Sequence, residues 1–455
     1  MGIASDEARA LTVSEIIDQR PLSRFQIWTI LMCGLVLLLD GFDTQCIGFL
    51  VPPISETLGI PLKNFGPVLA AGLIGLMISA MAMGPVADRW GRKWVVVLST
   101  LAFGTFAMLT GKVTSFQSLV ALRFLTGLGL GGAMANVIAL TSEYSPKRLQ
   151  NVFVAMVTCG MPLGALVGGV LSSFVIPRWG WRPVFYAGGI LPFTIALLLI
   201  WVLPESVRFL TVSGADPRKI ARIVARIAPE LAGVPLNHAA MREQQLEQRR
   251  EGLPVRHLFT EGRAAGTILL WIPFFMNLLI LYFIVSWLPA LLRQASMPIS
   301  AGVTAVSLFS LGGVAGTLCQ GKAMNAWGAH AALLVEFALS TLLVASLSFL
   351  TTSFGLMMVV TLVLGIFVQG AQAGINALSA SFYPTAIRAT GVGWALGVGR
   401  IGSIVGPVIG GVLLSLGWSA RQILLAGAIP AACAAVAIAL SIRLSQAAGA
   451  AWSAR

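Results

Sequence analysis

The stretch LLLDGFDTQCIGFLVPP, residues 37–53, places two carboxylates inside an apolar run that extends from Phe25 to Val51. Asp40 and Asp43 are three residues apart, so a helix would present both side chains on one face. A charge at membrane depth costs about 2.5–3.5 kcal/mol on insertion scales, and it therefore faces a partner or a water-filled cavity. Two interpretations follow, namely a structural ion-pair network or a site for a proton or a substrate.

The composition extends this prediction from one helix to the whole chain. Its 455 residues are 57% hydrophobic and 10% charged, with a mean hydropathy of +0.88. Apolar runs of about 20 residues, the length that a membrane span needs, recur along the chain. The net charge is +13, but the cations lie in short segments between the apolar runs. This pattern is typical of a protein in a lipid bilayer and not of a nucleic-acid-binding patch.

We predict an all-α membrane protein with twelve transmembrane helices. The predicted spans are 25–51, 65–87, 94–112, 117–141, 150–176, 181–203, 265–292, 302–321, 329–350, 354–377, 388–416 and 420–442. The corresponding domains are an N-terminal segment (1–24), a six-helix bundle (25–203), a polar linker (204–264), a second six-helix bundle (265–442) and a tail (443–455). The linker contains an amphipathic basic piece suited to a membrane surface.

Lysine and arginine sort to one side of the predicted membrane. With the linker, that side carries Arg20, Arg24, Arg89, Arg92, Lys93, Lys147, Arg148, Lys322, Arg388 and Arg443. The positive-inside rule therefore places the N-terminal segment, the linker and the tail in the cytoplasm. Residues 1–24 are polar and include four acids, so we expect no cleavable signal peptide.

The two predicted bundles look like repeats of each other. GALVGGVLSS (164–173) matches GPVIGGVLLS (406–415), and GPVADRWGRK (84–93) has a degenerate counterpart in GKAMNAWGAH (321–330). WGWRPVFYAGG (179–189) likewise resembles the stretch that begins at Leu416. Pseudo-symmetric bundles with a site between them are the architecture of alternating-access carriers.

Three motifs together resemble signatures of the major facilitator superfamily. They are GPVADRWGRK between the second and third spans, RFLTGLGLGG (123–132) in the fourth and CGMPLGALVGG (159–169) in the fifth. Two further stretches resemble the aromatic acid:proton symporter family, namely the DGxD element at 40–43 with its following IGFLVPP, and SFYPTAIRATGVGWALGVGRIGSIVGP (381–407). The resemblance implies proton-coupled uptake of an aromatic carboxylate such as 4-hydroxybenzoate, protocatechuate or benzoate. It also implies a bacterial inner-membrane protein, which we expect to be a monomer.

The resemblance assigns roles to particular residues. Asp40 and Asp43 correspond to the family's required acids and are the candidates for proton coupling. The charged positions that match the family are Arg123, Glu143, His330, Arg388 and Arg400. The loop motif predicts a conformational latch made of Gly84, Asp88, Arg89, Gly91, Arg92 and Arg388. In it, Asp88 would face the positive N-terminal end of the eleventh span.

Two arginines compete for the substrate carboxylate. Arg123 could neutralise a first-span acid or Glu143, because intramembrane charges usually pair. Arg400, within GVGRIGS (397–403), could bind a carboxylate bidentately, with the flanking glycines leaving room for the ligand. It could equally pair with Glu336 or with an acid of the other bundle, so the choice stays open.

Aromatic side chains are expected to stack on the substrate ring. Tyr282, Phe283, Trp287 and Phe309 are available, but we select Phe42 and Trp394 as the binding candidates. His330 lies at a loop end, where solvation is a simpler explanation than a proton relay, and Glu336 has no evident partner in the sequence.

Other functions remain open at this point. A carrier for another small organic anion is one alternative; few polar amides line the spans, which argues against a sugar. A transporter-like nutrient sensor is another, but a sensor would be expected to have a larger extension or to lack the acids. Three scattered histidines form no nucleophile–base pair or metal cluster. We therefore expect no enzyme activity, no metal and no cofactor, with protons as the coupling ion.

Overall fold

The computed structural model describes residues 13–213, 216–231, 255–260, 262–349 and 353–453. The first half of the predicted segment 1–24, much of the linker and the last two residues of the tail lie outside these ranges. Within them, twelve helical spans are long and apolar enough to cross a membrane. The predicted number of spans and the all-α membrane fold are therefore confirmed.

The first bundle contains six spans. Its helices are α3 (Arg24–Leu58), α4 (Gly66–Trp90, preceded by the 3₁₀ turn η1 at Leu62–Phe65), α5 (Arg92–Thr110), α6 (Phe116–Tyr144), α7 (Lys147–Thr158) with α8 (Gly160–Trp179), and α9 (Arg182–Val202). The fifth span is formed by α7 and α8 together.

The second bundle repeats this pattern. Its helices are α13 (Ala264–Gln294), α14 (Ile299–Trp327), α15 (Ala329–Leu347), α16 (Phe354–Phe382), α17 (Thr385–Ser415), and α18 (Ala420–Ala426) with α19 (Ala428–Ser453). Short elements lie before and between the bundles: α2 (Val13–Gln19), α10 (Val207–Val212), α11 (Pro217–Ile227), η2 (Pro229–Leu231) and η3 (Val255–Leu258).

The first span is longer than expected. Ser23 caps the start of α3 with a capping box, in which its hydroxyl accepts from the backbone N–H of Gln26 at 3.3 Å. The helix then continues through Pro52 and Pro53, where the sequence suggested an end, and stops at Gly59 with φ 65°. Prolines are tolerated here because neighbouring membrane helices can satisfy the freed backbone groups.

The internal repeat is visible in the backbone. Gly91 and Gly328 occupy matching positions of the two loop motifs and adopt similar left-handed conformations, with φ 96° and 81°. Gly180 and Gly417, which match in a second pair of repeats, have φ values of 74° and 79°. Glycine is favoured at such angles because other residues rarely adopt them. The sequence repeats therefore correspond to turns of matching conformation in the two bundles.

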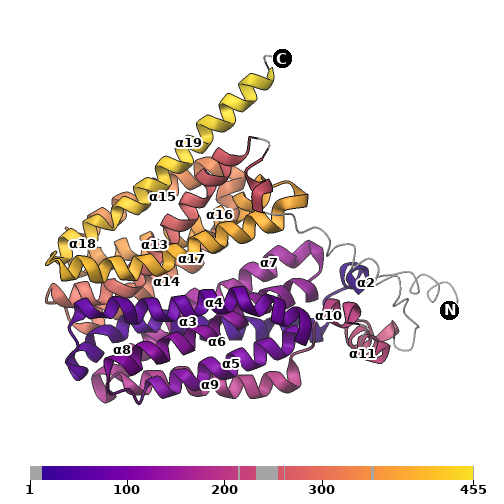
Figure 1. Ribbon diagram of the computed structural model, residues 1–455, viewed down its shortest axis with the longest axis horizontal. Helices are drawn as coiled ribbons and strands as arrows, with labels where there is room; N and C mark the ends of the chain where they lie inside the picture. Colours follow the sequence, from indigo (N-terminus) through magenta and orange to yellow (C-terminus); the bar gives the residue numbers. More distant parts are fainter. Residues whose placement is uncertain (1–12, 214–215, 232–254, 261, 350–352, 454–455) are drawn as a thin grey trace.

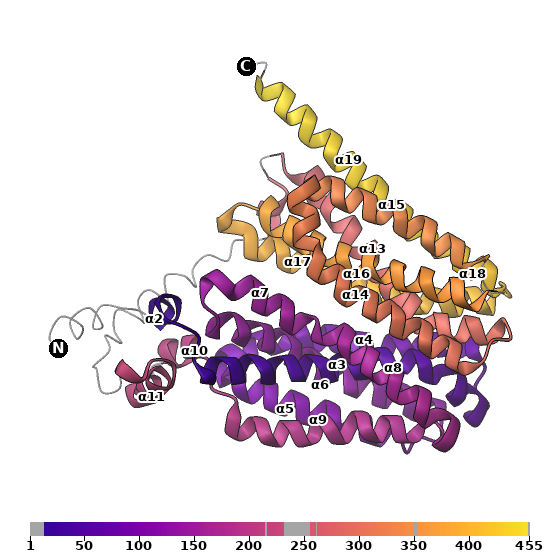
Figure 2. The ribbon, with the colours of Figure 1, turned by 180° about the vertical axis from the view of Figure 1, so that it is seen from behind.

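The two bundles meet more closely at one end of the molecule. We call the end that carries Gly91, Pro204 and Gly328 the linker end, and the other the far end. Figures 1 and 2 show the two groups of helices converging at the far end and diverging toward the linker end, where α2, α10 and α11 lie. An ion pair joins Glu56 to Arg293 at 3.1 Å across the far end.

Close helix approach depends on glycine inside each bundle. A Cβ built on Gly164 of α8 would overlap the backbone oxygen of Leu38 on α3. One on Gly127 of α6 would overlap the oxygen of Gly72 on α4. Small residues at such crossings let membrane helices pack by van der Waals contact.

We predict that Gly164→Val separates α3 from α8 and destabilises the protein. Overpacking costs about 1–3 kcal/mol, and here the clash is with backbone that cannot rotate away. The measurement is the thermal unfolding temperature of the purified protein in detergent. Gly355→Val is the matched control, since a Cβ there meets nothing within 4 Å. Equal unfolding temperatures for the two variants would contradict the packing described above.

Candidate functional site

A buried ion pair joins Asp43 of α3 to Arg123 of α6. The Nη1 group of Arg123 donates to both carboxylate oxygens of Asp43, at 3.0 and 3.1 Å. The side chains are 4% exposed for Arg123 and 2% for Asp43. Of the partners proposed for Arg123, the structure thus selects a first-span acid and not Glu143. The pair lies wholly within the first bundle.

Asp40 lies three residues earlier on α3 and has a different environment. Its side chain is fully buried, and Oδ1 accepts from the Thr44 hydroxyl at 2.9 Å. Within the described part of the chain, Oδ2 has no hydrogen-bond partner. Arg400 of the second bundle is close enough to act on Asp40 electrostatically, as is Asp43. Asp40 therefore combines a buried, unused acceptor atom, which favours the protonated acid, with a nearby opposite charge, which favours the ionised form. These opposing influences suit a group that exchanges a proton.

Arg400 of α17 lies where three helices meet. Its Nη1 donates to the Tyr282 hydroxyl of α13 at 3.4 Å, and its Nη2 contacts the Met134 sulfur of α6 at 3.0 Å. A thioether is only a weak acceptor. No carboxylate of the described residues lies within ion-pair distance of Arg400, so its charge is not consumed by an internal partner. The side chain is partly exposed and contacts both bundles.

The glycines around Arg400 have a different function from the one expected. A Cβ on Gly402 would overlap the Phe275 backbone oxygen, and one on Gly399 would lie 3.1 Å from the Phe274 oxygen. These two glycines let α17 approach α13 and do not create room for a ligand. Only Gly397 of the motif has open space beside it. The predicted reason for the glycines is therefore corrected for Gly399 and Gly402.

Phe42 and Trp394, the aromatic residues selected from the sequence, do not lie beside Arg400. The Phe42 ring is 4% exposed and packs within the first bundle, 2.8 Å from the position of a Cβ on Gly188 of α9. Trp394 is 47% exposed and stacks on Trp271, with ring centroids 6.2 Å apart. Because Trp394 and Arg400 are about one and two-thirds helical turns apart on α17, their side chains point about 120° apart.

Sequence reasoning passed over the aromatic residue that does contact Arg400. Tyr282 was one of the four available aromatics, but only the packing of α13 against α17 places it beside Arg400. Met134 and Thr44 were also missed. The spacing of Thr44 four residues after Asp40 could have revealed the hydrogen bond between them.

Glu143 belongs to a cluster at the linker end. It accepts from Arg92 Nη1 and, at 2.6 Å, from the Ser206 hydroxyl. Glu205 Oε1 accepts from the backbone N–H groups of Arg92, Lys93 and Ser206 at 2.8–3.1 Å. The carboxylate therefore caps the positive N-terminal end of α5. Neither Glu205 nor Ser206 was predicted, although an acid and a serine directly after a span, facing loop cations, indicate such a cap.

The remaining members of the predicted latch lie around this cluster. A Cβ on Gly91 would overlap the Glu205 carboxylate, so only glycine fits there. A Cβ on Gly84, in contrast, would meet nothing within 4 Å. Asp88 and Arg89 are exposed at the end of α4, and Arg388 is exposed near the start of α17. That these residues latch the bundles together stays a prediction.

His330 and Glu336 are apart from the Arg400 group, on α15. His330 is partly exposed, and its Nε2 lies 3.4 Å from the Ser441 hydroxyl. Glu336 is 7% exposed and accepts from the Gln320 amide at 3.2 Å. The partner that the sequence did not reveal for Glu336 is therefore a neutral amide of α14.

We predict that Asp43 and Arg123 act as one structural unit. Asp43→Asn leaves Arg123 buried without its counter-ion, which costs about 3–5 kcal/mol. Replacing both residues, by Asp43→Asn with Arg123→Gln, removes the unpaired charge and should recover most of that loss. Thermal unfolding in detergent measures both effects. Glu56→Gln breaks the exposed pair with Arg293 and serves as a control that should cost about 0–1 kcal/mol. A double variant that unfolds no higher than Asp43→Asn alone contradicts the assignment.

The chain is similar to known carriers over nearly its full length. The family model described as Major Facilitator Superfamily matches residues 33–353. The 4-hydroxybenzoate transporter PcaK of Pseudomonas aeruginosa is 39% identical, over 96% of this chain and 97% of its own. A gallate transporter of Pseudomonas putida is 37% identical, over 94% of each chain. These relatives are named as transporters and not as enzymes.

Solved structures agree on the fold. A bacterial homologue of the human lysosomal transporter Spinster, in an inward-facing and unoccupied conformation, has a TM-score of 0.70 and 17% identity, covering 92% of this chain and 97% of its own. A D-xylose–proton symporter has a TM-score of 0.69 and 15% identity, covering 91% and 97%. The predicted family membership is confirmed: the chain belongs to the major facilitator superfamily, in the group that contains the 4-hydroxybenzoate and gallate transporters.

Proposed function

We propose that the protein carries an aromatic carboxylate, such as 4-hydroxybenzoate, protocatechuate or benzoate, into the cell together with protons. The observation that carries this proposal is Arg400, a partly exposed guanidinium between the bundles with no carboxylate of the described residues within ion-pair distance. The names of the relatives support the substrate class. A guanidinium can hold a carboxylate through two parallel hydrogen bonds, and Tyr282 beside it offers an aromatic ring and a hydroxyl.

The proposed orientation follows from the charge distribution. The linker end carries the loop cations and the basic helix α11, so the positive-inside rule assigns it to the cytoplasm. The far end then faces the periplasm of a bacterial inner membrane. In this orientation, the end at which the two bundles converge (Figure 1) is the periplasmic end.

The proposed coupling depends on the charge of Asp40. When Asp40 is ionised, its carboxylate attracts Arg400 and competes with the carboxylate of the substrate. When Asp40 binds a proton, this competition ends and the guanidinium is available to the substrate. Proton and substrate therefore favour each other's binding, as symport requires.

Asp43 has a different part in this mechanism. The sequence assigned proton coupling to both acids, but the hydrogen bonds from Arg123 hold Asp43 as a fixed ion pair. A counter-ion that stays in place favours the ionised carboxylate and so opposes proton uptake. We therefore assign proton exchange to Asp40 and the positioning of α3 against α6 to Asp43. The two bundles would then rock around Arg400 and Asp40.

We predict that Asp40→Asn abolishes accumulation but not exchange. Asparagine is neutral like the protonated acid and cannot release a proton, so substrate can cross in both directions without coupling. In vesicles energised by a proton gradient, labelled 4-hydroxybenzoate should only equilibrate, and an uncoupler should have no further effect. Efflux in exchange for unlabelled substrate should persist. Glu230→Gln, which changes an exposed acid of η2 outside the spans, should accumulate substrate like the parent protein. Accumulation of substrate against its concentration gradient by Asp40→Asn would contradict the coupling scheme.

We predict that Arg400→Gln weakens substrate binding about 10- to 100-fold, because a hydrogen bond to a charged group contributes about 1.5–3 kcal/mol. The measurement is the concentration of benzoate that half-inhibits uptake or binding of labelled 4-hydroxybenzoate. Benzyl alcohol, which lacks the carboxylate, should compete poorly with the parent protein. Arg421→Gln, on an exposed arginine of α18, is the control. An unchanged preference for benzoate over benzyl alcohol in Arg400→Gln would show that another residue binds the carboxylate.

A further inference from the structure

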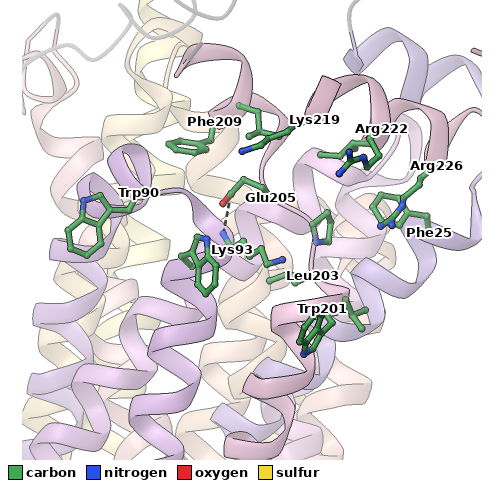
Figure 3. Close-up of a pocket in the computed structure, with 15 residues that line it drawn as sticks. Phe25, Trp90, Lys93, Trp201, Leu203, Glu205, Phe209, Lys219, Arg222 and Arg226 are labelled. Carbon is green, nitrogen blue, oxygen red and sulfur yellow. Dashed lines mark hydrogen bonds between the residues drawn. The ribbon is translucent and has the colours of Figure 1, made fainter. Parts of the chain in front are cut away.

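A groove lies at the linker end of the first bundle, outside the site described above. It has a cavity volume of ≈ 420 Å³ and is lined by the ends of α4 and α9, the starts of α3 and α5, and the short helices α10 and α11 (Figure 3). This volume falls within the range of about 300–1,000 Å³ that is usual for small-ligand sites.

The groove is strongly cationic. Lys219, Arg222 and Arg226 of α11 line it from one side and Lys93 of α5 from the other (Figure 3). The three residues of α11 are spaced by three and four positions, so they share one face of the helix. The opposite face packs inward through Ile220 and Val224, each at most 2% exposed, which fixes the orientation of α11.

These cations have little acidic compensation among the described residues, where Glu205 acts electrostatically on Lys93. Among the described residues, none of the four forms an ion pair within 4 Å. Glu205 is the single acid of the lining, and its Oε1 already accepts three backbone N–H bonds. The four cations and this one acid leave the groove with a net charge of +3. An external anion is the occupant that this charge distribution fits.

The walls of the groove identify the depth at which the anion would sit. Trp90 and Trp201 stand on either side of Lys93 and are 68% and 84% exposed (Figure 3). They lie at the ends of membrane-spanning helices, as does Trp94 at the start of α5. Tryptophans at such positions mark the level of lipid headgroups.

An apolar surface continues from the groove into the membrane. Leu98 lies one turn below Trp94 on α5 and is 51% exposed, and Leu197 lies one turn below Trp201 on α9 and is 46% exposed. These helices pack side by side. An occupant with an anionic head and two apolar tails would contact the cations and this surface together, whereas free phosphate would use only the cations.

We propose that this groove binds the headgroup of an anionic phospholipid, with its acyl chains along α5 and α9. Lys219 and Arg222 contact the phosphate from α11, and Lys93 contacts it from α5. The lipid thereby joins the linker helix to the first bundle beside the Glu205 cap. A basic pocket at the membrane surface is the kind of site that recognises such headgroups.

The test compares lipid retention by the full-length protein purified in detergent. Phosphatidylglycerol or phosphatidylcholine with the same acyl chains is added, and native mass spectrometry counts the lipids that remain bound. The parent protein should retain phosphatidylglycerol preferentially. The double variant Lys219→Gln with Arg222→Gln should retain it about thirtyfold less, because each cation near the surface contributes about 1 kcal/mol.

Matched variants separate this site from general charge. Arg148→Gln with Arg218→Gln removes two exposed cations that do not line the groove, and should leave retention unchanged. Trp201→Ala removes an apolar wall without changing charge, and should weaken retention while the bundle stays folded. It also provides an independent variant should the first one lose its folded state.

Three outcomes overturn the proposal. Equal losses in the two double variants would show attraction by overall charge. Equal retention of phosphatidylglycerol and phosphatidylcholine by the parent protein would show that the headgroup is not recognised. Displacement of phosphatidylglycerol by millimolar inorganic phosphate would assign the groove to a free anion.

Discussion

The ion pair between Asp43 and Arg123 determines how the other charges of the membrane interior are used. Both side chains are almost completely buried, where an unpaired charge costs several kcal/mol. By neutralising each other they tie α3 to α6 and remove one acid from further chemistry. Asp40, three residues away on the same helix, is left without an equivalent partner in its own bundle. The opposite charge that acts on it, Arg400, comes from the second bundle.

Because Asp40 and Arg400 belong to different bundles, the contact between the bundles brings together the charges of the proposed transport site. Arg400 reaches Met134 of the first bundle and Tyr282 of the second, so a rocking motion changes its surroundings directly. The far end is joined by the Glu56–Arg293 pair, which is exposed and weak enough to break in a transport cycle. Buried charge thus holds the first bundle together, while exposed charge and a shared arginine connect the two bundles.

The linker end follows the same logic at the membrane surface. Glu143 and Glu205 bind the loop between α4 and α5 through Arg92 and through backbone N–H groups. The glycine at position 91 permits this approach, because any side chain would occupy the space of the Glu205 carboxylate. The cations of α11 lie beside this cluster but are not part of it. Their placement suits a surface whose other component is the lipid itself.

The sequence alone determined the architecture: twelve spans, their duplication and the family could all be read from apolar run lengths, repeated glycines and motifs. These features are local, and the bilayer constrains them because backbone polar groups must be satisfied within each helix. It also identified Asp40, Asp43, Arg123 and Arg400 as charges that need an explanation.

Only the tertiary structure decided which charge meets which. It paired Arg123 with Asp43, put Tyr282 beside Arg400, turned Phe42 into the first bundle and brought Glu205 to the end of α5. Such contacts depend on the rotation of each helix about its axis and on the approach that glycines allow, and neither quantity is expressed in the sequence of a single span.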